Sequence, residues 1–423
     1  MNERLLQFIW QFQYFNTTAL ETCEGESLEI LAPGQFNTNQ GPDFTSAMIR
    51  LGETTWAGTV ELHIKSSDWI KHAHQNDNQY KNVILHVVWD HDERVNSIPV
   101  LELKNRVAKI LLHQYSEWMN SRNFIPCEKN LHTVSSIVWS AWKERLLAER
   151  LLRKAGLIEK YLEQNNYHWE ESFWWLLARN FGMKVNADCF ESIARSLPLA
   201  MLARKKNQIH QLEALLIGQA GLLNQDFEED YPRLLQREYR FQQKLEGLQP
   251  LPLPPVFLRM RPVNFPLIRL AQLAMLVHES AHLFSKIKEA STVEKVRNWF
   301  AVTANDYWHY HYRFDEVSAY KKKTLGEQMT NTIIINTVVP LLYAYGHYHR
   351  DNRYKEKALQ WLEQTGPEEN SIIKKFKHMG IPCSSGYDTQ SLIELKNEYC
   401  QHKKCLDCAA GNNILKQSGK QDE

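Results

Sequence analysis

The order of hydrophobic and polar positions changes its period once along the chain. Before Arg106, apolar residues form short runs bounded by turn-forming residues, which is typical of β-strands, at 28–31, 44–51, 56–65, 83–89 and 100–103. An opening helix is predicted because Leu5, Ile9 and Trp10 recur at helical spacing, and the polar stretch 72–82 has the length of a second helix. This pattern predicts an α/β module with a mixed sheet, in the order helix, three strands, helix, strand.

From Arg106 onward, apolar residues recur every three or four positions, which is the period of an amphipathic helix. Helices are predicted at 142–155, 173–181, 208–223, 265–283 and 357–364. A chain of 423 residues is longer than a single hydrophobic core usually serves. We therefore expect an α/β module over 1–125, a mainly α-helical region over 126–375, and a C-terminal segment with a cysteine metal site and a polar tail over 376–423.

Composition and charge exclude several classes of protein. With 43% hydrophobic residues and 13 tryptophans, the chain can bury a large core. Its net charge of +1 does not give the field of a general nucleic-acid binder, although local basic patches stay open. The longest apolar run, 332–345, is interrupted by polar residues and Pro340, so no membrane partner is expected. An odd number of cysteines, seven, and the lack of a signal-like start favour a cytoplasmic protein.

Acidic and basic side chains gather on one predicted strand of the α/β module. Residues 59–65 alternate, which places Glu61, His63 and Lys65 on one face. A hairpin with the preceding strand could bring Asp43 beside Glu61, and two carboxylates there could hold Mg²⁺ or Mn²⁺ and activate water for phosphodiester hydrolysis. A nearby nitrogen base would then orient that water. His86 is the one polar residue in an otherwise apolar strand, so we expect it to face a polar site.

The same residue types also fit a plain structural interpretation. Strands with Glu, His and Lys on one face are often simply exposed to solvent. His72, His74 and Asp77 lie in a polar stretch that is typical of a solvated helix, although His74 and Asp77, at positions i and i+3, could share a metal.

The module resembles the core of the PD-(D/E)XK nuclease superfamily, on the order of its elements and on Pro42-Asp43 ahead of Glu61-x-His63. In that superfamily the Asp and the Glu bind the metal, and a Lys two residues beyond the Glu assists the water. The resemblance implies these roles for Asp43, Glu61 and the position of His63, with Lys65 as a substitute for the missing lysine. Most of the chain also resembles an uncharacterised bacterial family, a domain of unknown function, through 41–44, 58–63, 68–80, 85–88 and 259–266. That second resemblance implies no activity.

Four cysteines near the end of the chain have the spacing of metal ligands. Cys383, Cys400, Cys405 and Cys408 follow the pattern C-x16-C-x4-C-x2-C. Four thiolates can close around a zinc ion or an iron–sulfur cluster, and both alternatives stay open. Such a site would staple the C-terminal helices, because no redox-partner motif accompanies it.

Two further motifs lie in the helical region. Arg259, Arg261 and Arg269 surround two prolines and could contact nucleic-acid phosphates, although arginines packed along a surface are the commoner case. The segment 278–282 matches H-E-x-x-H, which on one helix would bind zinc through His278 and His282 beside a glutamate base.

Three hypotheses follow in decreasing order of support. The first is a metal-dependent nuclease, or a degenerate nuclease-like protein, acting on DNA or RNA. The second is a non-catalytic binding or scaffold protein whose nuclease-like core has lost activity and whose cysteine site is structural. The third is a zinc peptidase at His278 and His282.

Overall fold

The computed structural model describes residues 1–94, 98–249, 251, 254–258 and 260–419. The chain divides into two compact units. The first unit combines Met1–Trp142 with Leu395–Glu423, and the second unit is Lys143–Glu394. The second unit is therefore inserted between the two stretches that make up the first.

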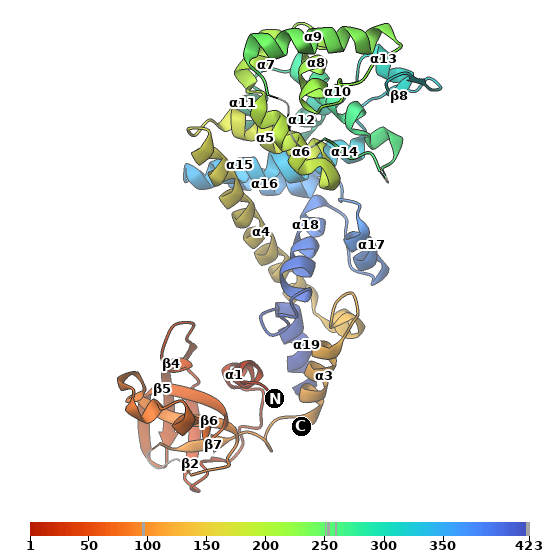
Figure 1. Cartoon of the computed structure of the whole chain (residues 1–423). Helices are drawn as coiled ribbons and strands as arrows, with labels where there is room; N and C mark the ends of the chain where they lie inside the picture. Colours follow the sequence, from red (N-terminus) through yellow and green to blue (C-terminus); the bar gives the residue numbers. More distant parts are fainter. Residues whose placement is uncertain (95–97, 250, 252–253, 259, 420–423) are drawn as a thin grey trace. The chain divides into compact units, whose positions relative to one another are not determined.

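A seven-stranded mixed sheet lies in the first unit (Figure 1). Its strands are β1 (Leu20–Glu21), β2 (Ser27–Ala32), β3 (Gln35–Phe36), β4 (Phe44–Leu51), β5 (Thr54–Lys65), β6 (Val83–Asp90) and β7 (Val100–Glu102). The order is β1-β2-β4-β5-β6-β7, with β3 paired to β4. The pairs from β1 to β5 are antiparallel, whereas β5–β6 and β6–β7 are parallel. The mixed sheet and the five predicted strands are confirmed.

Strands β5 and β6 are the buried centre of the sheet. Helix α1 (Glu3–Phe12) contacts β5, and it begins at Asn2, whose side chain accepts a hydrogen bond from the Leu5 N–H. Residues 60–63 of β5 and 83–88 of β6 are buried without alternation, as expected for strands covered on both faces. The two strands approach closely at Gly58, where a Cβ atom would lie 2.6 Å from the Asn82 carbonyl oxygen. This approach fixes the register in which Glu61 lies opposite His86.

The prediction of one helix over the polar stretch 72–82 is wrong. Between β5 and β6 the chain forms the short helix α2 (Asp68–Lys71) and two 3₁₀ turns, η1 (His74–Asn76) and η2 (Asn78–Tyr80). Ala73 adopts a left-handed conformation with φ of 57°, which ends the helical path between His72 and His74. Asp77 then caps η2 by accepting a hydrogen bond from the Gln79 N–H at 2.9 Å.

The remaining elements of the first unit come from both of its stretches. They are α3 (Lys109–Asn120), η3 (Glu128–Thr133), the π-helix η6 (Leu395–Cys400) and α19 (Ala409–Gly419). Helix α19 packs against α3 and η3. The Lys396 ammonium also donates a hydrogen bond to the Phe124 carbonyl oxygen at 2.7 Å. The C-terminal stretch is thus part of the packing of the first unit.

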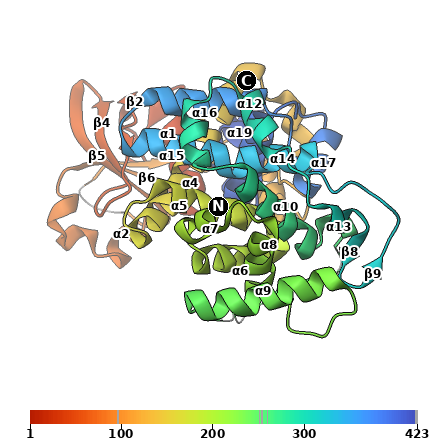
Figure 2. The same cartoon turned by 90° about the horizontal axis from the view of Figure 1, so that it is seen from above.

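The second unit is mainly helical, as predicted, and helices α8, α9 and α10 pack side by side within it (Figures 1 and 2). Large buried side chains such as Trp174, Phe284 and Trp308 fill its core. Among the described residues, none of the helices is both long and apolar enough to cross a membrane. In chain order the elements are α4 (Ser136–Gln164, which begins in the first unit), α5 (Trp169–Phe181), α6 (Met183–Ser196), α7 (Leu199–Lys205), α8 (Ile209–Gln219), α9 (Asp230–Glu246), η4 (Pro262–Asn264), α10 (Pro266–Glu279), α11 (Leu283–Glu289), α12 (Val293–Phe300), α13 (Asp306–His309), β8 (His311–Arg313), β9 (Glu316–Val317), α14 (Glu327–Ile333), the π-helix η5 (Ile334–Val338), α15 (Val339–Tyr348), α16 (Asn352–Gln364), α17 (Ser371–His378) and α18 (Gly386–Glu394).

A buried carboxylic acid links three elements of the second unit. Glu213 of α8 has no exposed surface, and its Oε2 accepts hydrogen bonds from the Tyr231 hydroxyl at 2.8 Å and the Trp308 indole at 3.0 Å. Its Oε1 accepts from the Asn305 amide at 2.7 Å. Burial raises the pKa of Glu213 to about 7, although the hydrogen bonds from Trp308 and Tyr231 act to lower it.

Candidate metal centre

Strands β5 and β6 and the segment between them bring four histidines and one glutamate together. Glu61 and His63 lie on β5, His86 lies on β6, and His72 and His74 follow α2. Beside these groups packs the buried ring of Trp69, whose centroid is 5.2 Å from that of His86 and 5.3 Å from that of His74.

The donor atoms of four of these residues converge. His63 Nε2 is 3.1 Å from His72 Nδ1 and 3.6 Å from Glu61 Oε1, and His74 Nε2 is 3.5 Å from the same glutamate oxygen. One donor atom each from His63, His72 and His74 lie within 4.8 Å of one another. His74 Nε2 is also buried without a hydrogen-bond partner among the described residues. A buried polar atom in that condition is costly, and a bound cation at this point would satisfy it.

The protonation state of the buried imidazoles suits metal binding. Burial, followed by the neighbouring histidines, lowers the pKa of His63 to about 3. Burial and the charge of His74 lower the pKa of His86 to about 4. Both rings are therefore neutral at pH 7, and a neutral imidazole is the form that ligates metals.

The contact with His86 occupies the Nδ1 atom of His63 and leaves its Nε2 atom for the other groups of the cluster. His63 Nδ1 is 2.9 Å from His86 Nε2, so one of the two nitrogens carries the shared proton. When His63 Nδ1–H is the donor, His63 Nε2 presents a lone pair toward Glu61 and His72. Metal-binding histidines are commonly oriented by such a bond at the other ring nitrogen. His86 is thus a positioning residue in this arrangement.

Asp43 lies beside Glu61 but makes different contacts. Its backbone N–H donates to Glu61 Oε2 at 3.0 Å, while its own carboxylate accepts from the Leu62 N–H at 3.0 Å and from the Gln7 amide at 2.8 Å. Burial and the Asp43 charge raise the pKa of Glu61 to about 8, and burial raises the pKa of Asp43 to about 6. The hairpin does bring the two acids together, whereas the assignment of Asp43 as a metal ligand stays a prediction.

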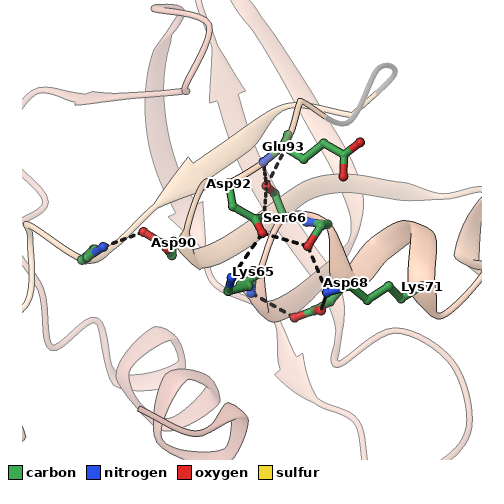
Figure 3. A network of polar contacts seen from close by, with 9 residues as sticks. Lys65, Ser66, Asp68, Lys71, Asp90, Asp92 and Glu93 are labelled. Carbon is green, nitrogen blue, oxygen red and sulfur yellow. Dashed lines mark hydrogen bonds and ion pairs between the residues drawn. The ribbon is translucent and has the colours of Figure 1, made fainter.

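Lys65 belongs to a separate polar network at the ends of β5 and β6 (Figure 3). Its ammonium lies 3.5 Å from Asp92 Oδ2, and its backbone N–H donates to Asp68 Oδ2 at 3.1 Å. Asp92 also accepts hydrogen bonds from Ser66 and Ser67, which outweigh its desolvation and lower its pKa to about 2. The network ties the start of the segment with His72 and His74 to the end of β6. Lys65 is exposed there and makes its ion pair with Asp92 instead of Glu61.

The arginines predicted to bind nucleic acid have unlike surroundings in the second unit. Arg269 is buried and donates to Gln272 Oε1 at 2.8 Å and to Asn264 Oδ1 at 2.6 Å, so its guanidinium is not available to a phosphate. Arg261 is exposed, and its role stays a prediction. Arg259 lies outside the described residues.

The prediction of one continuous helix through the H-E-x-x-H motif is wrong. Helix α10 ends at Glu279, Ser280 is extended, and His282 has a left-handed conformation with φ of 51°. The two histidines therefore do not share one helix face. His278 Nδ1 instead contacts the Lys206 carbonyl oxygen. The zinc-peptidase hypothesis is not supported by this geometry.

The predicted grouping of four cysteines is not shown. Cys400, Cys405 and Cys408 lie in the first unit, whereas Cys383 lies in the second, where its thiol donates to the Ile381 carbonyl oxygen at 3.3 Å. None of the seven cysteines, all of which lie among the described residues, forms a disulfide bond.

Sequence reasoning placed Glu61, His63 and His86 in the site but left His72 and His74 as parts of a solvated helix. The signal available for them was the H-x-H spacing just after Asp68-Trp69. That spacing became informative only with the left-handed turn at Ala73, after which His74 faces Glu61 while His72 faces His63.

The fold and the site define a protein with a mixed-sheet module that carries a cluster of four histidines and one glutamate. Residues 3–371 match a family described as a protein of unknown function (DUF2851), and the chain belongs to that family. No curated protein and no solved structure was found to match it.

Proposed function

We propose that this protein is a metal-dependent hydrolase of phosphodiester bonds in DNA or RNA, with the metal held by Glu61, His63, His72 and His74. The observation that carries the proposal is the group of three imidazoles, His63, His72 and His74, whose donor atoms lie within 4.8 Å of one another, with Glu61 Oε1 3.6 Å from His63 Nε2 and 3.5 Å from His74 Nε2. Three histidines and a carboxylate are a common metal-binding set in proteins.

The ligand set favours a transition metal. Carboxylate and water oxygens suit Mg²⁺, whereas imidazole suits Zn²⁺, Fe²⁺ and their neighbours. We therefore propose Zn²⁺ or Fe²⁺ in preference to Mg²⁺. Of Mg²⁺ and Mn²⁺, the two metals expected from the carboxylates alone, Mn²⁺ is the better candidate. Once bound, such a metal lowers the pKa of a coordinated water and polarises a phosphoryl oxygen.

The residues around the ligands have distinct tasks in this proposal. His72 is exposed, so the ligand set is open to solvent and substrate on its side. Glu61 is held by the Asp43 N–H through one oxygen, which leaves the other oxygen facing His63 and His74. The phosphodiester class is supported by the resemblance to PD-(D/E)XK nucleases, because Asp43 directly precedes β4 and Glu61 and His63 lie on the neighbouring strand β5, in the order that it implies.

One observation favours a second candidate, a non-catalytic binding protein with the same metal. The water-assisting lysine of the nuclease pattern has no counterpart among the described ligand residues, because Lys65 is paired with Asp92. In this alternative the metal organises the segment with His72 and His74 into a recognition surface.

Metal titration followed by nuclease assays tests both candidates. The purified protein should bind about one Zn²⁺ or Fe²⁺ per chain at this centre and cleave single-stranded, duplex or branched nucleic acid with that metal. His74→Ala should weaken metal binding at least tenfold, because it removes one of the proposed metal ligands, and it should abolish cleavage. His113→Ala, at an exposed histidine of α3, is the matched control and should change neither. Metal binding without cleavage on any substrate would favour the binding protein, and no response of metal affinity to His74→Ala would refute the site itself.

A further inference from the structure

Three cysteines of the first unit lie in one short segment, and a fourth comes from a distant part of the same unit. Cys400 ends η6, Cys408 directly precedes α19, and Cys405 lies in the loop between them. Cys127 directly precedes η3. Cys127, Cys405 and Cys408 are buried, and Cys400 is partly buried.

Contacts on both sides of Cys127 hold it against the segment with the other three cysteines. Upstream, the Phe124 carbonyl oxygen accepts the hydrogen bond from Lys396 at 2.7 Å. Downstream, the Thr133 carbonyl oxygen accepts a hydrogen bond from the Gln417 amide at 3.1 Å, and η3 packs against α19. The pair Lys396 and Gln417 brackets the three cysteines in sequence, just as Phe124 and Thr133 bracket Cys127.

The four thiols also influence one another electrostatically. Burial raises the pKa of Cys400 well above its usual value, and the charges of Cys408, Cys127 and Cys405 raise it further. Burial raises the pKa of Cys127 as well, followed by the charges of Cys408 and Cys405. For Cys383, by contrast, the groups that act after burial are Asp388, Lys377 and Lys143.

The local backbone is shaped around the thiols. Burial raises the pKa of the Cys408 thiol, whereas the backbone N–H groups of Gly411 and Ala410, in the first turn of α19, act to lower it. A Cβ atom at Gly411 would lie 2.3 Å from the Cys405 carbonyl oxygen, so the cysteine loop closes directly onto this turn. Lys403, between Cys400 and Cys405, has a left-handed conformation with φ of 53°. Backbone N–H donors to cysteine sulfur and nearby lysines stabilise thiolates, which are the metal-binding form.

We propose that Cys127, Cys400, Cys405 and Cys408 ligate an iron–sulfur cluster, and that Cys383 does not. Four neighbouring thiols in a buried position would stay protonated without a metal, whereas a bound metal replaces their protons and offsets the charge of the thiolates. The spacing C-x4-C-x2-C is one of those found at cluster sites.

The separation of the sulfur atoms favours a cluster over zinc. Thiolates on one tetrahedral zinc ion, with Zn–S bonds of about 2.3 Å, lie about 3.8 Å apart. Within the described part of the chain, His63, His72 and His74 form the one group of three potential ligands whose donor atoms all lie within 4.8 Å of one another. No three of the four sulfur atoms therefore lie within 4.8 Å of one another in the described part of the chain, which is a wider spacing than one zinc ion requires. A cluster, whose ligands bind different iron atoms, accommodates that spread.

Anaerobic purification of the full-length protein, with iron, acid-labile sulfide and zinc analysis, tests the metal. We expect about two or four irons per chain, a matching amount of sulfide, and the broad visible absorption that zinc thiolates lack. Protein that has lost the cluster should regain this absorption after anaerobic incubation with ferrous iron and sulfide. Absence of acid-labile sulfide together with zinc beyond the one ion expected at the Glu61 centre, or a colourless protein that reconstitution does not change, would overturn the cluster.

Matched cysteine variants test the ligand set. Cys127→Ser should lose most of its iron and its visible absorption, whereas Cys383→Ser, at a buried cysteine of the second unit, should keep both at the wild-type level. The proposal fails if Cys383→Ser loses the cluster and Cys127→Ser keeps it. Far-UV circular dichroism shows whether each variant is folded, and Cys405→Ser provides a second ligand variant if Cys127→Ser does not fold. The sulfide content and the visible absorption are independent of the metal centre at Glu61, because a single ion held by histidines and a glutamate brings no sulfide. An ion bound there adds at most one zinc or iron per chain to the metal analysis.

Discussion

Replacement of the buried acid Glu213 by glutamine should remove a defined part of the pH dependence of the second unit's stability. The Glu213 carboxyl is enclosed by the Tyr231 hydroxyl, the Asn305 amide and the Trp308 indole, at distances of 2.7 to 3.0 Å. Its pKa is raised by burial from the ordinary value of 4.5 to about 7. The folded protein therefore holds this proton more tightly than the unfolded chain does.

The sign and size of the effect follow from proton linkage. Below the unfolded pKa of 4.5 both states are protonated, so the full stability is present. As the pH rises from there to about 7, the unfolded state releases its proton first and the free energy of unfolding falls. Above the folded pKa both states are ionised and the loss is complete. The shift corresponds to about 3 kcal/mol, as an order of magnitude.

Urea unfolding at pH 5, 6, 7 and 8, followed by far-UV circular dichroism, measures this effect. Glu213→Gln loses some hydrogen bonding at every pH, because its amide group faces donors, so the informative quantity is the difference between wild type and variant at each pH. That difference should change by about 2.5 kcal/mol between pH 5 and pH 8, in the direction that favours the variant at high pH, because a small part of the effect is already lost at pH 5. Glu159→Gln, at an exposed position of α4, is the control: its free energy of unfolding should change with pH in the same way as that of wild type. A difference between wild type and Glu213→Gln that is constant with pH would refute the reasoning.

Four smaller changes test other parts of the structure. Gly58→Ala should destabilise the first unit by ~1–3 kcal/mol, because its Cβ would lie 2.6 Å from the Asn82 oxygen and push β5 from β6; thermal unfolding measures this loss. The same displacement should weaken metal binding, which a metal titration measures. The same substitution at Gly156, where the position is open in α4, should stabilise the protein by up to ~1 kcal/mol in the same unfolding experiment. His86→Leu should lower metal affinity by ~10–100-fold in a titration, as expected for a residue that orients a ligand. Lys65→Ala should leave metal affinity unchanged, because its ammonium is paired with Asp92 at 3.5 Å, and a large loss would return Lys65 to the site.

The fold was largely predictable because burial leaves a periodic trace in the sequence. The alternation in β4 and the short apolar runs of β2, β6 and β7 located those strands to within one or two residues. The helix expected over 72–82 failed because a single left-handed residue, Ala73, breaks it, and nothing in the local composition requires that conformation. The helix expected over 265–283 was likewise interrupted after Glu279.

The candidate sites were predictable only where their residues lie on one strand. Glu61 and His63 share a face of β5 by strand periodicity, and His86 stood out as a polar residue in an apolar run. His72 and His74 depend on the path of a loop, which periodicity does not determine. The pattern of cysteines gave no reason to single out Cys127, because it lies far from Cys400 in sequence and shares its unit only through packing such as that of η3 against α19.

The insertion of the second unit within the first has a consequence for synthesis on the ribosome. The sheet and α3 emerge early, but α19, which packs against α3 and η3, emerges only after the whole inserted unit has been made. Until then, apolar side chains such as Leu111 and Leu131, which are buried in the finished protein, lack part of their packing. Nascent chains stalled or truncated within the insert should therefore be prone to aggregation or proteolysis at this surface, even where the sheet has already formed.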